Sequence, residues 1–104
     1  MSKVLEITSK DQYEEFKKKH SRGVIFYSAE WCTACKDLKP FYDRVAARYH
    51  KRTTFAYIDI DIAKLDFTTV PAFVSFRKGT MLNSMEGADK NSLKEFIKEA
   101  IKAP

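Results

Sequence analysis

The feature that most constrains the fold is a pair of cysteines placed directly after the most apolar run of the chain. Residues 24–27 are four consecutive apolar residues, which is typical of a central strand buried on both faces. Trp31 and Cys32 follow, and from residue 33 to residue 49, beyond Cys35, apolar side chains recur at helical spacing. The sequence therefore predicts a buried strand, a short loop, and a helix that begins between the two sulfurs.

The rest of the chain predicts a single α/β domain, residues 1–104, with a central mixed sheet and helices on both faces. The first half is predicted to contain a strand at 4–7, a helix from a Ser9 cap to about His20, an interruption at Gly23, the strand at 24–27 and the helix at 33–49 with a kink at Pro40. A strand at 54–60 follows, and then an ambiguous segment at 62–69 with room for a turn or two of helix. The chain is predicted to end with a strand at 72–76, a hairpin turn at Lys78 and Gly79, its partner strand at 81–85 and, after Gly87, a last helix capped by Asp89 or Asn91.

The position of the cysteines predicts redox chemistry. A helix N-terminus presents unpaired N–H groups and lowers the pKa of a thiol placed there, and the thiolate is the form that attacks disulfides. We therefore interpret Cys32, nearer the helix end, as the nucleophile, and the deeper Cys35 as the resolving thiol. Two inert core cysteines fit this position poorly, and a monomeric iron–sulfur cluster would need more cysteines. A zinc site would need two further ligands, and His20 and His50 lack the spacing, so we predict no metal and assign neither histidine a catalytic role.

The charge and the hydropathy of the chain limit the kinds of partner that it can bind. Lysine and arginine number 19 against 14 acidic residues, a net charge of +5, and the bases form no single block. We interpret them as solvated surface, with a mild preference for acidic partner proteins, and we expect no nucleic-acid partner. No apolar run approaches the roughly 20 residues of a membrane helix, so we expect no membrane partner. The first five residues do not resemble a signal peptide, which favours the cytoplasm.

Several segments together resemble the thioredoxin family over essentially the whole chain. They are the active-site segment at 28–36, the kinked-helix segment at 39–41, the cis-proline segment at 70–73, the turn at 77–79 and the glycine at 87. The resemblance implies a thioredoxin fold and a protein disulfide reductase, with Trp31, Val70, Pro71 and Gly87 forming a substrate platform around Cys32. It also implies a monomer without a cofactor of its own, recharged by a thioredoxin reductase-like electron donor, and a role in electron transport and cell redox homeostasis.

Three departures from the family pattern bear on how well such a site works. Thr33 and Ala34 replace the usual Gly-Pro between the cysteines, where Thr33 either donates to the thiolate or caps the helix. Phe26 stands where the family buries an aspartate that handles the proton of the resolving cysteine, and Tyr57 stands where bacterial members add a lysine.

We therefore expect a slower reductase unless water, Glu30, Lys36 or the Tyr57 hydroxyl takes that proton. An interaction module with little or no redox turnover is the alternative. The third departure is length: only ten residues separate Asp61 from Pro71, so the family's helix before the cis-proline is expected to shrink to a turn.

Overall fold

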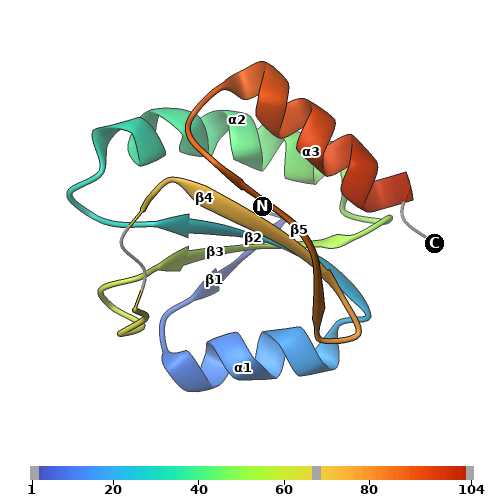
Figure 1. The fold of residues 1–104 in the computed structure, drawn as a ribbon, viewed down its shortest axis with the longest axis horizontal. Coiled ribbons are helices and arrows are strands. Elements are labelled where there is room, and N and C mark those ends of the chain that lie inside the picture. Colours follow the sequence, from blue (N-terminus) through green and yellow to red (C-terminus); the bar gives the residue numbers. More distant parts are fainter. Residues whose placement is uncertain (1–2, 67–68, 103–104) are drawn as a thin grey trace.

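A five-stranded sheet forms the centre of the protein, with helices on both faces (Figure 1). The structure is a computed structural model of the 104-residue chain and describes residues 3–66 and 69–102. The elements follow one another as β1 (Val4–Ile7), α1 (Lys10–Lys19), β2 (Arg22–Ser28), α2 (Thr33–Tyr49), β3 (Thr54–Asp59), β4 (Ala72–Arg77), β5 (Thr80–Glu86) and α3 (Lys90–Lys102). The predicted mixed sheet and the thioredoxin fold are confirmed.

The strands lie in the order β1-β3-β2-β4-β5. β1, β3 and β2 run parallel, whereas β4 is antiparallel to β2 and β5 is antiparallel to β4. β2 is therefore the middle strand, and residues 24–27 are at most 1% exposed. Figure 1 shows α1 on one face of the sheet and α2 with α3 on the other, which explains why this run carries no charged side chain.

Sequence signals at the helix and turn boundaries are confirmed. Ser9 caps α1 by accepting a hydrogen bond from the Gln12 backbone N–H at 3.1 Å. Of the two candidate caps for α3, the structure selects Asp89, which accepts from the Ser92 N–H at 2.9 Å. The hairpin turn consists of Lys78 and Gly79, both with positive φ (52° and 81°), as a two-residue turn of type I′ requires.

The prediction for Gly23 is wrong, because this residue lies inside β2, paired with Thr54 and Phe76, instead of interrupting the chain. A Cβ at this position would lie 2.6 Å from Cε1 of Phe76 and 3.2 Å from Cε2 of Phe16. Two aromatic rings occupy the space that a side chain would fill, so glycine here serves close packing.

The segment between β3 and β4 contains turns and no helix within its described residues. The Ala63 N–H donates to Asp59 O at 3.0 Å and the Leu65 N–H to Ile60 O at 2.8 Å, which closes a single compact turn. Residues 67 and 68 of the segment that the sequence left ambiguous lie outside the described residues. Pro40 lies inside α2 without ending it.

Candidate active site

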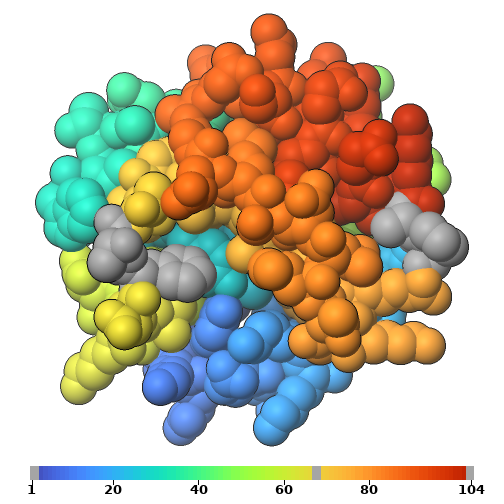
Figure 2. Space-filling view, in the orientation of Figure 1, coloured from blue at the N-terminus to red at the C-terminus, as the bar shows by residue number. Residues whose placement is uncertain are grey.

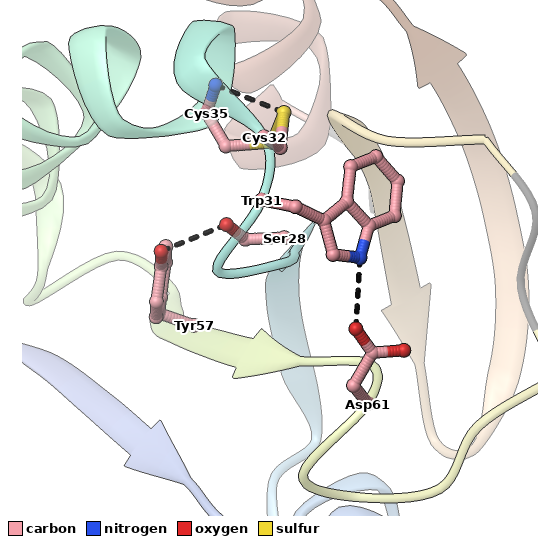
Figure 3. Close-up of a disulfide and its surroundings, with 6 residues drawn as sticks. All are labelled: Ser28, Trp31, Cys32, Cys35, Tyr57 and Asp61. Atoms are coloured by element: carbon pink, nitrogen blue, oxygen red, sulfur yellow. Dashed lines mark hydrogen bonds between the residues drawn. A yellow bond between two sulfur atoms is a disulfide. The ribbon is translucent and has the colours of Figure 1, made fainter.

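The two cysteines form a disulfide at the start of α2, with their Cα atoms 5.3 Å apart. Cys32 is the N-cap residue, and its Sγ accepts a hydrogen bond from the Cys35 backbone N–H at 3.1 Å (Figure 3). Cys32 is 7% exposed, whereas Cys35 is fully buried. The structure thus confirms the predicted order of depth, with the Cys32 sulfur at the helix end and the Cys35 sulfur beneath it.

Packing of α2 against the sheet holds the sulfurs in place. The buried face of α2 consists of Cys35, Leu38, Tyr42 and Ala46. The Tyr42 hydroxyl donates to Ala56 O at 2.8 Å, with Val24 O at 3.2 Å. Burial raises the pKa of Tyr42 well above its ordinary value, so this hydroxyl remains a hydrogen-bond donor that ties the helix to β2 and β3.

The cis-proline segment lies at the same end of the sheet as the disulfide. The Val70–Pro71 peptide bond is cis, as the resemblance implied. Because Ala72 pairs with Tyr27 near the carboxyl end of β2, Val70 and Pro71 continue beyond the sheet beside the loop that leads to Cys32. Gly87, with φ of 103°, donates its N–H to Pro71 O at 2.9 Å, so the structure brings these two predicted residues together.

Trp31 is an exposed residue of the predicted platform, with 65% of its surface accessible. Its indole Nε1–H donates to Asp61 Oδ2 at 2.8 Å (Figure 3). Asp61 is not among the site residues that the sequence predicts. The signal that could have found it is its position just after β3, because the carboxyl ends of neighbouring parallel strands meet at one edge of a sheet.

The residues between and beside the cysteines are exposed. Thr33 and Ala34 lie in the first turn of α2. Cys32 caps this helix, so the suggested capping role of Thr33 is wrong, and in the part of the chain that the structure describes its hydroxyl has no hydrogen-bond partner. Lys36 pairs with Glu30 at 3.3 Å on the surface, where such a pair contributes little to stability.

Phe26 and Tyr57, the two replacements of the family's ion pair, lie side by side with ring centroids 5.0 Å apart. Phe26 is fully buried. The Tyr57 hydroxyl shares a hydrogen bond of 2.8 Å with Ser28 Oγ, and Figure 3 shows this pair at the base of the loop that carries Trp31. Apart from tyrosine hydroxyls and the cysteines, the buried polar side chains among the described residues are Ser28, Thr53 and Ser75, so no buried carboxylate serves Cys35 there.

The described residues contain no cluster of three or more metal-ligating side chains. Nor is any helix among them both long and apolar enough to cross a membrane. The site consists of two sulfurs, a helix terminus and the exposed indole of Trp31, which together can exchange a disulfide with a bound peptide.

Comparisons with known proteins agree with this geometry. A family model described as Thioredoxin matches residues 3–99. Thioredoxin-3 of Dictyostelium discoideum is 29% identical over 97% of this chain and 100% of its own length, and the thioredoxin of Equus caballus is 32% identical over 94% and 99%. Among solved structures, Plasmodium falciparum thioredoxin superimposes with a TM-score of 0.85 at 27% identity, covering 92% of this chain and 98% of that one.

Proposed function

The chain belongs to the thioredoxin family, and we propose that it runs the family's exchange chemistry in the reducing direction, on disulfides of other proteins. It is a thiol–disulfide oxidoreductase whose redox pair is Cys32 and Cys35. The observation that carries the proposal is the Cys32 sulfur at the N-cap of α2, where it accepts the Cys35 N–H. After reduction, the same donor and the helix dipole favour the Cys32 thiolate.

The exchange takes two steps. The Cys32 thiolate attacks one sulfur of the substrate disulfide, which forms a mixed disulfide and releases the other substrate sulfur as a thiolate. Cys35 then loses its proton and attacks Cys32 Sγ, which forms the Cys32–Cys35 disulfide and releases the second substrate sulfur. Two electrons pass to the substrate, and the oxidised protein is the state that the structure describes.

The substrate peptide lies on the exposed surface around Cys32. Trp31 supplies a large apolar face, and the backbone of Val70, before the cis-proline, offers edge-strand pairing. The hydrogen bond from the indole to Asp61 fixes the ring orientation, so Asp61 acts as a positioning residue.

Among residues 3–66 and 69–102 no buried carboxylate can take the proton of Cys35, which leads us to propose slower turnover than in relatives that carry the aspartate. Tyr57 is a weak candidate acceptor, because its hydroxyl is already hydrogen-bonded to Ser28. Glu30 and Lys36 are exposed and paired with each other. Water reaching the mixed disulfide is therefore the acceptor that we favour.

We further propose that the protein works as a monomer in the cytoplasm and receives electrons from a thioredoxin reductase-like enzyme that uses NADPH. A reductase needs a continuous supply of electrons, which reducing compartments maintain and oxidising ones do not.

A coupled assay tests the proposal. With thioredoxin reductase and NADPH, or with dithiothreitol, wild-type protein is expected to reduce insulin, Cys32→Ser to be inactive, and Cys35→Ser to accumulate a mixed disulfide. The reduction potential of the Cys32–Cys35 pair is expected to be about −270 mV, as in the reducing members of the family, and far from the roughly −120 mV of strongly oxidising ones. A value near the latter would indicate an oxidase, and no turnover at all would favour the interaction module.

A further inference from the structure

All three helices end at one end of the sheet, opposite the disulfide (Figure 1). Hydrogen bonds join the segments that meet there. Arg22 at the start of β2 donates from Nη1 to Ile101 O in the last turn of α3 at 3.0 Å. The Lys78 N–H of the hairpin donates to Ser21 O, just after α1, at 2.9 Å. Figure 2 shows the hairpin, in orange, between α3, in red, and α1, in blue. We call this end the basic pole.

Two adjoining hollows cross the basic pole. The first has a volume of about 320 Å³, and its basic lining residues are Lys19, His20, Arg22, His50, Lys51 and Arg52. Hydroxyl groups of Ser21, Thr53 and Thr54 line it as well. The second, of about 400 Å³, shares the segment 19–21 and adds three further lysines, Lys17, Lys18 and Lys78. We call the two hollows together the basic trough.

Most cations of the basic trough lack acidic partners. No acidic side chain lines either hollow, and in the described parts of the chain the only trough base in an ion pair is Lys17, with Glu14 at 3.1 Å. Among the described bases outside the trough, Lys36, Lys39 and Lys98 each have a carboxylate within 4 Å. The positive field of the trough is therefore left for an external anion to neutralise.

The helix dipoles do not account for this concentration of charge. Each helix C-terminus carries roughly −0.5 of an elementary charge, so three of them supply roughly −1.5. Four lysines and arginines line the first hollow and three more line the second, which makes seven positive charges. A large excess of positive charge remains after the dipoles are counted.

We propose that the basic trough binds a linear polyphosphate chain. Two connected hollows suit an elongated anion better than a single phosphate. Phosphate oxygens accept hydrogen bonds from ammonium, guanidinium and hydroxyl groups. The trough provides all three, from its lysines, from Arg52 and from three hydroxyl side chains. Neither hollow is lined by an aliphatic side chain or by Phe, Tyr or Trp, so the trough lacks the apolar groups that insert into lipid, and the imidazoles of His20 and His50 are the only aromatic rings in its lining on which a nucleic-acid base could stack.

The two histidines of the chain provide a direct probe, since both line the first hollow. Partial burial, and then the Lys19 ammonium, lower the pKa of His20 below its usual value. A bound polyanion would offset the effect of Lys19 and raise this pKa. The test is therefore a proton NMR titration of the oxidised protein with linear polyphosphate, following the imidazole resonances of His20 and His50 at constant ionic strength.

The expected result is a saturable shift of both imidazole resonances and an increase in the His20 pKa. Lys51→Gln with Arg52→Gln is expected to weaken binding by about tenfold or more, because it removes two charged hydrogen-bond donors to phosphate. Lys10→Gln with Lys94→Gln is the matched control, since it removes the same charge from exposed positions outside the trough. This control is expected to bind nearly as the wild type does.

Four results would overturn the proposal. The first is the absence of a saturable shift. The second is an equal loss of affinity in the control variant, which would indicate only long-range attraction. The third is equal binding of polyglutamate of the same charge, which would show no preference for phosphate. The fourth is tighter binding of a single-stranded oligonucleotide or of vesicles containing phosphatidylserine, which would assign the surface to nucleic acid or to a membrane.

Discussion

Replacing Phe26 by aspartate tests whether the missing carboxylate limits turnover. The Phe26 ring is fully buried, with centroids of Tyr42 and Tyr57 at 5.0 Å and of Phe73 at 4.5 Å. Tyr42 and Cys35 belong to the same buried face of α2. A carboxylate at position 26 would therefore lie beneath the helix that carries the resolving sulfur, where it could accept the Cys35 proton.

The substitution has a stability cost that sets the design of the experiment. Truncating a buried phenylalanine costs about 3–5 kcal/mol, out of a total of about 5–15 kcal/mol for a typical domain. The control is Phe26→Asn, which creates nearly the same cavity and buries a polar group of the same size without a base. A positioned base contributes about 10²–10⁴-fold, so we expect the Asp variant to exceed the Asn variant by at least about tenfold in the resolving step.

The assay follows the decay of a preformed mixed disulfide on Cys32 by stopped flow at low temperature, alongside insulin reduction. Trp31 is the only tryptophan of the chain and provides the optical signal. Circular dichroism confirms that both variants are folded under these conditions. Equal rates for the two folded variants, or turnover of the Asp variant no higher than that of wild type, would refute the reasoning.

Three further predictions follow from single contacts. Gly23→Ala is expected to destabilise the protein by about 1–3 kcal/mol through overlap with Phe76, and an unchanged melting temperature would contradict this. Asp61→Ala is expected to shift the Trp31 emission and raise KM several-fold, whereas Asp61→Asn, which keeps an acceptor oxygen, should do so less. Hydrogen bonds from Ser92 lower the pKa of Asp89, so the stabilisation that Asp89 gives to α3 is present above its unfolded-state pKa and is lost as the pH falls through its folded-state pKa. In an acid titration, Asp89→Ala is therefore expected to lose less folding stability over that pH range than the wild type does.

The redox pair could be predicted from sequence because its geometry is local. The buried run at 24–27, two cysteines three positions apart and the helical periodicity that follows determine which sulfur caps the helix. The caps at Ser9 and Asp89 are local for the same reason. Each signal is contained within a few residues, so no knowledge of strand pairing is needed.

Contacts that depend on strand pairing were missed or misinterpreted. The Trp31–Asp61 hydrogen bond joins residues 30 positions apart and exists because β2 and β3 run parallel and end together. From the sequence, Gly23 is expected to interrupt the regular structure before the buried strand. In the structure, the rings of Phe16 in α1 and Phe76 in β4 leave room only for glycine there. A single sequence shows neither which strands are neighbours nor which ring fills which space.

The basic pole shows the same limit at a larger scale. Basic residues are common at helix C-termini, where they complement the dipole, so no single cluster in the sequence indicates a binding surface. The topology then collects these ends at the amino end of β2, while the cysteines lie beyond its carboxyl end, at Ser28. Seven residues of strand separate the two by about 20 Å, more than twice the Debye length of about 8 Å at physiological ionic strength. The charges of the pole are therefore screened from Cys32, and saturating polyphosphate is expected to leave insulin reduction unchanged; a large change in rate would show that the two ends are coupled by something other than charge.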